Sequence, residues 1–298
     1  MVKPIPLVTV ITPYRNAAHW LPGLVETLQK QTYGHWECLL VNHGSTDAGA
    51  ELLNDLVADD SRFRCFEVPL PSDGRHPEGG PAVPRNLALA HAAGDLICFL
   101  DVDDLWHPCK LERQVQIHTE QHLDLSVTAY YRWSWQTPDQ MQWCCPPRRL
   151  TTWHWRWGNP IPMLTVMLSR GLLQSLPQPK DALFESVPHE DYLLWLRLAR
   201  CVPSLRFGCV AEGLAIHRRF HSNLTAQRWR MPMWTLGVYR RLGWSSWMCW
   251  MSLLVWTIAH AVRLVREGLG WGCCRLRPNT MLQSVPQGRK ALFQTNQQ

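Results

Sequence analysis

The sequence predicts an α/β fold with a doubly wound, mostly parallel sheet and flanking helices over at least residues 5–125. Short apolar runs alternate along this region with stretches that repeat apolar residues at helical spacing, which is the pattern of successive strand–helix units. The chain also has enough apolar material for a core, because 46% of its 298 residues are hydrophobic and 18% are charged. This composition excludes wholesale disorder, and the length suits one large or two medium domains.

Each predicted element of this region has a local signal. In order, the elements are the strand 7–12, the helix 21–28, the strand 38–41, the helix 52–57, the strand 63–68, the helix 86–93 and the strand 96–100. Pro13 ends the first strand, and the helix after it repeats leucine and valine at i, i+3, i+4 and i+7. Loop and N-cap residues at 44–47 precede the second helix, and Gly94 ends the third. Five prolines and three glycines make residues 69–84 a long loop.

The pattern is less regular beyond residue 125, and no internal repeat is visible. It predicts, in order, the strands 126–135 and 163–169, the helix 193–199, the strand 205–211, a helical segment 226–270 and a flexible tail 271–298.

Cysteine usage and the N-terminus indicate the compartment. The eleven cysteines are odd in number and have no C-x-x-C spacing, which favours reduced thiols over a disulfide framework or a zinc site. The first apolar run is too short for a signal peptide and is rich in β-branched residues. We therefore expect a cytoplasmic protein.

Charge and tryptophan are distributed unevenly along the chain. Residues 1–225 carry 20 Lys and Arg against 23 Asp and Glu, whereas residues 226–298 carry 10 against one. Seven of the 17 tryptophans also lie from residue 229 onward. A basic, tryptophan-rich segment indicates an anionic partner, either a membrane or a nucleic acid. Because no nucleic-acid-binding motif accompanies it, the sequence predicts no nucleic-acid partner.

Residues 242–262 lie within this basic segment but contain no Asp, Glu, Lys or Arg over 21 residues. A membrane span needs about 20 mainly apolar residues, but serine, threonine and histidine interrupt this run. On a helix, the large apolar side chains form one stripe, made of Trp244, Trp247, Met248, Met251, Leu254, Val255, Ile258, Val262 and Val265. The pattern predicts an amphipathic helix at an anionic membrane surface, with packing of the stripe on the protein or a membrane span as the alternatives.

An acidic cluster follows the strand 96–100 and contains Asp101, Asp103 and Asp104. Ligands bind at the carboxyl ends of the strands in an open parallel sheet. Carboxylates gathered at one strand end need a compensating cation, and hard oxygen ligands select Mg²⁺ or Mn²⁺. A solvated acidic turn before a helix at Pro108 is the alternative, and Asp104 is interpreted as a helix-start residue.

Four blocks strengthen the metal-site interpretation. They are VTVITPYRN at 8–16, VNHGSTD at 41–47, RNLALA at 85–90 leading to FLDVDDLW at 99–106, and HEDY at 189–192. In order and spacing they resemble family 2 glycosyltransferases. The resemblance implies a GT-A domain over residues 1–225, with a nucleotide-sugar half at about 1–125 and an acceptor half at 126–225. It also implies transfer of a sugar from a nucleotide-diphosphate donor to a hydroxyl, with inversion.

The resemblance also implies roles for individual residues. Asp191 matches the catalytic base, and Arg85 matches a position near the donor diphosphate. Asp103 matches the metal-binding carboxylate, and Asp101 would help to hold the metal or the donor. His221 is a further candidate metal ligand, because enzymes of this fold can use a late histidine. The implied cofactor is Mn²⁺ or Mg²⁺.

The nucleotide base would lie between the first and second loops of this domain. By the same resemblance, Thr12 and Tyr14 flank the base and His43 approaches it. The family commonly has two aspartates where this chain has Asn42 and His43, so the donor nucleotide stays open. A catalytically inactive nucleotide-sugar-binding or interaction protein on the same fold, and a nucleotidyltransferase, remain as alternative functions.

The acceptor is expected to be a glycan or a lipid-linked molecule at the inner face of the cytoplasmic membrane. Residues 227–229 resemble a signature of processive family members but differ from it in spacing, which favours single-sugar transfer. Six tryptophans between residues 133 and 157 are candidates for an acceptor surface. Trp153, Trp155 and Trp157 would share one face of a strand, with core packing as the alternative.

Overall fold

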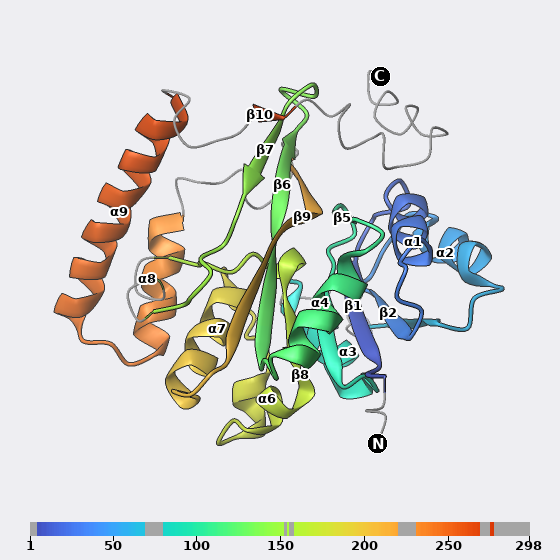
Figure 1. Cartoon of the computed structure of the whole chain (residues 1–298), viewed down its shortest axis with the longest axis horizontal. Coiled ribbons are helices and arrows are strands. Elements are labelled where there is room, and N and C mark those ends of the chain that lie inside the picture. Colours follow the sequence, from blue (N-terminus) through green and yellow to red (C-terminus); the bar gives the residue numbers. More distant parts are fainter. Residues whose placement is uncertain are drawn as a thin grey trace.

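The computed structural model describes residues 5–68, 80–151, 154, 158–219, 231–268 and 275–276. One curled sheet runs through the molecule and carries helices on both faces (Figure 1). Its strand order is β3-β2-β1-β4-β8-β6-β7-β10, with β9 beside β6 and β5 paired to β9. The predicted α/β fold class is therefore confirmed.

The N-terminal half of the sheet is parallel. It contains β1 (Val8–Tyr14), β2 (Trp36–Asn42), β3 (Phe63–Glu67) and β4 (Leu96–Phe99). The parallel pairs are β1 with β2, β1 with β4 and β2 with β3. All four carboxyl ends consequently meet at one edge of the sheet, where an open parallel sheet binds its ligands.

The second half of the sheet is mixed. It contains β6 (Leu125–Ser134), β7 (Met141–Cys144), β8 (Met167–Ser169), β9 (Phe207–Arg219) and β10 (Arg275–Leu276). Strand β8 lies antiparallel between β4 and β6, and β9 runs parallel to β6. The two-residue strand β5 (Leu105–Trp106) pairs with β9 and so ties the segment that follows β4 to the far end of the chain.

Two hydrophobic cores lie on opposite faces of the sheet. Helices α1 (Leu21–Gln29), α2 (Gly49–Val57) and α4 (Lys110–Glu120) cover one face. Helices α3 (Ala82–His91) and α7 (Glu190–Cys201) cover the other. Strand residues alternate between the two cores, as Val10 and Ile11 do in β1, because successive side chains of a strand point to opposite faces. Shorter pieces are α6 (Arg170–Gln174) and the 3₁₀ turns Met163–Thr165 and Pro179–Ala182.

The C-terminal helical segment differs from the single stretch that the sequence predicts. It contains two helices, α8 (Met231–Arg241) and α9 (Ser246–Gly268). Gly243 separates them with a φ of +72°, a left-handed conformation that glycine adopts without strain. Helix α8 joins the core of the α3–α7 face, where Leu236, Val238 and Tyr239 are buried. Among the described residues, no helix is both long enough and apolar enough to cross a membrane.

Other boundaries also differ from the sequence prediction. The predicted strand 163–169 is divided into a 3₁₀ turn and β8, and the predicted strand 205–211 extends to Arg219. Strand β7 was not predicted, because four residues carry too little periodicity. Most of the predicted tail 271–298 lies outside the described residues, as do Trp153, Trp155 and Trp157.

One buried histidine makes stability depend on pH. His118 of α4 is 4% exposed, its Nε2 has no hydrogen-bond partner among the residues that the structure describes, and burial lowers its pKa to about 4. The folded protein therefore holds His118 neutral, whereas the unfolded chain protonates it near pH 6.5. We expect the free energy of unfolding to fall by about 3 kcal/mol as the pH drops from 6.5 to 4. Urea unfolding across this range measures the loss.

The matched comparison for this prediction is His118→Leu against His19→Leu, which replaces an exposed histidine. Leucine at position 118 cannot take up a proton, so the acid-dependent loss should shrink by about the same amount. The position 19 variant should keep it. Equal acid sensitivity in all three proteins would contradict this role for His118.

Candidate active site

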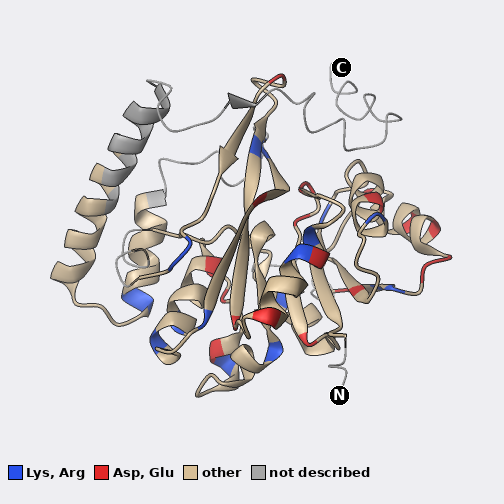
Figure 2. Ribbon diagram, in the orientation of Figure 1, with Lys and Arg blue, Asp and Glu red and all other residues tan. Residues whose placement is uncertain are grey.

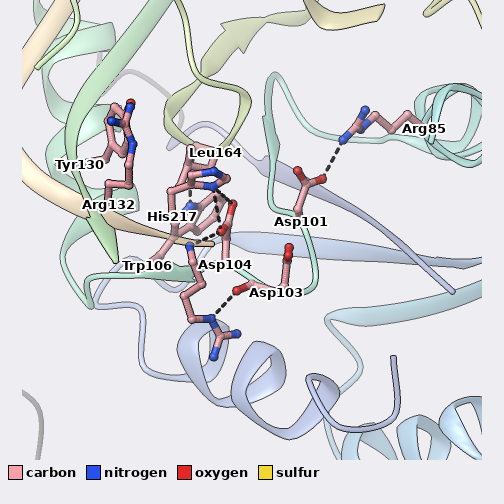
Figure 3. Close-up of polar contacts among 10 residues, drawn as sticks. Arg85, Asp101, Asp103, Asp104, Trp106, Tyr130, Arg132, Leu164 and His217 are labelled. Atoms are coloured by element: carbon pink, nitrogen blue, oxygen red, sulfur yellow. Dashed lines mark hydrogen bonds and ion pairs between the residues drawn. The ribbon is translucent and has the colours of Figure 1, made fainter. Parts of the chain in front are cut away.

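The acidic loop lies at the carboxyl edge of the parallel strands, directly after β4. The Asp104 N–H donates to the Asp101 carbonyl over 3.0 Å, so the loop turns back on itself. Its carboxylates consequently diverge: Asp101 points toward Arg85 and Asp104 toward His217, with Asp103 between them (Figure 3).

Asp104 anchors the loop to β9. Its carboxylate is 1% exposed and accepts hydrogen bonds from the Arg218 backbone N–H over 3.0 Å and from His217 Nδ1 over 3.2 Å. Burial opposes a charge on His217, but the neighbouring Asp104 carboxylate outweighs burial and raises the pKa of His217. The interpretation of Asp104 as a helix-start residue is wrong, because α4 begins at Lys110.

Asp103 has an environment that disfavours its ionised form. Burial, and then the charges of Asp104 and Asp101, raise its pKa to about 7. A nearby cation would relieve this unfavourable charge. In the described part of the chain, no three His, Cys, Asp or Glu side chains form a metal-binding group. Mg²⁺ and Mn²⁺ need fewer, since they commonly take one or two carboxylates and complete their shell with water and substrate phosphate. The predicted metal-binding roles of Asp101 and Asp103 stay predictions.

Arg85 joins the acidic loop to helix α7. Its guanidinium is buried in the second turn of α3, with a side chain 4% exposed. Nη2 donates to Asp101 Oδ1 over 2.7 Å, and Nη1 donates to Glu190 Oε1. The structure therefore places Arg85 between two carboxylates, an arrangement that suits a positioning role. The position near the donor diphosphate that the resemblance implies stays a prediction.

Asp191 occupies the first turn of α7. This helix begins after His189, which adopts a left-handed φ of 60°. The Asp191 carboxylate accepts the Tyr192 N–H over 2.7 Å at one oxygen and the Asn159 amide over 2.6 Å at the other. Burial raises the pKa of Asp191, and the charge of Asp101 adds to that increase. A carboxylate that is held in place and has a raised pKa is suited to accept a proton near neutral pH.

Two contributors to this network were not predicted. Glu190 precedes the predicted base in sequence, and burial raises its pKa although the Arg85 charge opposes that shift. Asn159 lies in a turn 32 residues before Asp191 and still binds it. The only sequence signal for Asn159 is its place in the Asn159–Pro160 turn, which carries no information about that partner.

The residues predicted to contact a nucleotide base lie at the ends of β1 and β2. Thr12 is fully buried and Tyr14 is 4% exposed, and burial is the first cause that raises the pKa of Tyr14. The His43 N–H donates to the Tyr14 carbonyl over 2.9 Å. Asn42 Nδ2 donates to Glu67 Oε1 over 3.2 Å, and Glu67 is exposed at the end of β3. Glu67 therefore adds an unpredicted carboxylate to this edge. His221 lies outside the described residues.

The sequence and the fold resemble those of known glycosyltransferases. The sequence model of glycosyl transferase family 2 matches residues 9–161. The chain is 29% identical over 241 residues to TuaG of Bacillus subtilis, assigned to teichuronic acid biosynthesis as a glycosyltransferase, and the match covers 80% of this chain and 88% of TuaG. It is 30% identical over 200 residues to the Escherichia coli UDP-Glc:alpha-D-GlcNAc-diphosphoundecaprenol beta-1,3-glucosyltransferase WfgD, covering 65% of this chain and 70% of WfgD.

Solved structures share the fold at lower sequence identity. Residues 1–349 of Staphylococcus aureus TarS in complex with UDP-GlcNAc superpose with a TM-score of 0.61 at 19% identity, over 78% of this chain and 64% of TarS 1–349. The present chain thus spans slightly less than two thirds of that structure. The Pyrobaculum calidifontis mannosyltransferase PcManGT in complex with GDP-Man and Mn²⁺ gives a TM-score of 0.60 at 17% identity, over 95% of this chain and 79% of PcManGT.

A parallel sheet that continues into a mixed half, together with these structural neighbours, defines the GT-A fold. The family assignment follows from the sequence match, which extends over half of the chain, and from the relationship to WfgD. The chain belongs to glycosyl transferase family 2 and is a glycosyltransferase.

Proposed function

We propose that the protein transfers a single sugar from a nucleotide-diphosphate donor to a hydroxyl of a glycan or lipid-linked acceptor, with inversion at the anomeric carbon. One observation carries the proposal. Asp191, whose pKa is raised, lies beside a network in which the buried Arg85 binds both Asp101 and Glu190. This network joins a candidate proton acceptor to the acidic loop at the ligand-binding edge.

In the proposed mechanism, Asp191 accepts the proton of the acceptor hydroxyl while the hydroxyl oxygen attacks the anomeric carbon. The bond between that carbon and the diphosphate oxygen breaks, and the nucleoside diphosphate leaves with the bonding electron pair. Attack from the opposite face inverts the anomeric configuration. Asn159 and the Tyr192 N–H hold one carboxylate oxygen each, so Asp191 is oriented before the acceptor arrives.

Asp101 and Asp103 would hold Mn²⁺ or Mg²⁺. When bound, such an ion neutralises the charge that develops on a departing diphosphate. The raised pKa of Asp103 supports this assignment, because burial and then the charges of Asp104 and Asp101 disfavour its ionised form, which a bound cation would stabilise. Asp104 is bound to β9 and would act indirectly by keeping the loop in place.

We propose that the donor base binds beside Tyr14 and His43, with Thr12 contributing only through packing because it is fully buried. Glu67 offers carboxylate oxygens that can accept an N–H of the base. Neither Asn42 nor His43 has a carboxylate for this purpose. The ligands of the two structural neighbours, UDP-GlcNAc and GDP-Man, both carry a base with a ring N–H next to a carbonyl group. The proposal is compatible with either nucleotide.

The proposed acceptor is lipid-linked and lies at the inner face of the cytoplasmic membrane. Support comes from WfgD, whose acceptor is a diphosphoundecaprenol-linked sugar, and from the basic composition of residues 226–298. Association with the membrane would then be peripheral and would bring the active site to its acceptor.

Donor turnover with and without metal tests the proposed function. We expect the purified protein to release nucleoside diphosphate from a UDP- or GDP-sugar when Mn²⁺ or Mg²⁺ is present, and chelation to lower the rate by about 10²-fold or more. Asp103→Asn should lose a similar factor, while Asp139→Asn in the exposed β6–β7 turn should retain the activity. A coupled assay for nucleoside diphosphate provides the rate.

Two outcomes would contradict the proposed function and favour a different one. Binding of nucleotide sugars without turnover across a broad donor and acceptor panel would indicate an inactive binding protein. Release of pyrophosphate from a nucleoside triphosphate would indicate a nucleotidyltransferase.

A further inference from the structure

Helix α9 presents five large apolar side chains to solvent. The exposed residues and their exposed fractions are Trp247 (68%), Trp250 (58%), Met251 (46%), Leu254 (53%) and Ile258 (54%). Among the α9 side chains that the structure describes, Cys249 and Ser252 are buried, with exposures of 2% and 5%. A helix that packs only to stabilise its own domain has the opposite arrangement, with its apolar stripe toward the core.

The exposed residues form one continuous surface, called here the α9 stripe: Trp247, Trp250, Met251, Leu254 and Ile258. Relative to Trp247 they lie at i+3, i+4, i+7 and i+11, so they share one helix face. In Figure 1, α9 lies on the outer flank of the molecule with α8 on its inner side. Contiguous apolar patches of this kind are rare on soluble monomers and mark interaction sites.

The charge around the stripe identifies the partner. Residues 226–266 contain six arginines and no aspartate or glutamate. Figure 2 shows no charged residue on the part of α9 that it colours tan and a basic cluster at the end of α8, where Arg240 and Arg241 are exposed. Tryptophan on an apolar face with arginine at its flanks is typical of helices that lie in the headgroup region of anionic bilayers.

We propose that the α9 stripe is a docking surface for an anionic lipid bilayer, with α9 lying in the plane of the membrane interface. The reason for docking rests on the proposed function, since a lipid-linked acceptor resides in the membrane. The docking itself depends only on the stripe and its charges. The alternative partner is a second copy of the chain, which could bind through the apolar patch alone. The surplus of arginine favours lipid, because two copies facing each other would bring like charges together.

The stripe is attached firmly to the catalytic helix. Trp244, which precedes α9, stacks on Tyr239 of α8 with ring centroids 4.5 Å apart. The Tyr239 hydroxyl lies 3.3 Å from the Tyr192 hydroxyl of α7. Tyr192 directly follows Asp191, so a bilayer bound at α9 would have a fixed relation to the candidate base. Deleting α8 and α9 would also uncover the core, and point substitutions on the exposed stripe are the appropriate test.

The test is flotation of full-length protein with vesicles of phosphatidylcholine and phosphatidylglycerol, compared with vesicles of phosphatidylcholine alone. We expect the wild type to float with the anionic vesicles and to bind the neutral ones more weakly. The variant Trp247→Ser/Trp250→Ser/Leu254→Ser should lower the partition coefficient by about tenfold or more. Ile5→Ser, which removes a 65% exposed apolar side chain ahead of β1, should float as the wild type does.

Failure of wild-type flotation with anionic vesicles, or equal flotation of the triple variant, would overturn the proposal. Analytical ultracentrifugation distinguishes the alternative partner: a dimer that the triple variant dissociates, without flotation, would assign the stripe to a second copy. Thermal midpoints of all variants verify folding. Nucleoside diphosphate release without vesicles is measured in parallel. If the wild type turns over donor but does not float, only the docking surface is rejected. If it floats but does not turn over donor, only the proposed function is rejected.

Discussion

Replacing Asp191 with asparagine is expected to lower kcat for sugar transfer by about 10²- to 10⁴-fold while leaving donor affinity nearly unchanged. A neutral acceptor hydroxyl is a weak nucleophile until its proton is taken. Asparagine keeps the size of the side chain and can still accept the Tyr192 N–H, but it has no carboxylate to take that proton. The loss should therefore fall on the chemical step.

The measurement combines initial rates with calorimetric binding of the nucleoside diphosphate in the presence of Mn²⁺. Asp55→Asn, an exposed aspartate of α2 on the opposite face of the sheet, is the matched control and should behave as the wild type does. Turnover of the Asp191→Asn variant at the wild-type rate would remove Asp191 from the role of base.

The pH dependence of the rate provides an independent check on the same residue. Burial raises the pKa of Asp191 above that of an ordinary aspartate, and only the deprotonated carboxylate can act as a base. Activity should therefore decrease as the pH falls through this raised pKa, and the decrease should begin at a higher pH than an exposed aspartate would give. The residual activity of Asp191→Asn should lack this acidic limb.

Local patterns in the sequence were sufficient to predict the parallel half of the sheet. The strands at 7–12, 38–41 and 96–100 are short apolar runs bounded by proline, glycine or acidic residues, and each corresponds to an observed strand. The acidic loop could be predicted for the same reason, since a strand end and its carboxylates are adjacent in sequence. The candidate base came from the family resemblance, because nothing near Asp191 in the chain distinguishes it from an ordinary helix-start residue.

The contacts that organise the site could not be predicted, because their partners are far apart in sequence. Arg85 meets Glu190 across 105 residues, and Asp104 meets His217 across 113. Their pairing depends on how α7 packs on one face of the sheet and on how β9 pairs with β5 and β6. Similarly, the periodicity of residues 242–262 identified a two-sided helix but not which side faces the protein. The structure resolves this by packing Cys249 and Ser252 inward.

The buried position of Arg85 leads to the second large effect, which is on stability. Arg85→Met should lower the free energy of unfolding by about 3–5 kcal/mol, because it leaves the Asp101 and Glu190 carboxylates without their shared cation. Glu190 is the more affected of the two, since its side chain is 15% exposed and that of Asp101 is 37% exposed. Urea unfolding at neutral pH measures the loss.

The matched control is Arg62→Met. Arg62 also binds a carboxylate bidentately, that of Asp60, but its side chain is 34% exposed and solvent can replace the lost partner. Its cost should be about 1 kcal/mol or less. The double variant Arg85→Met/Glu190→Gln should recover part of the loss, because neutral glutamine needs no counter-charge in a buried position. If Arg85→Met cost no more than the surface control, Arg85 would not be the cation that holds the acidic loop and the base-bearing helix together, and a direct role at the donor diphosphate would regain support.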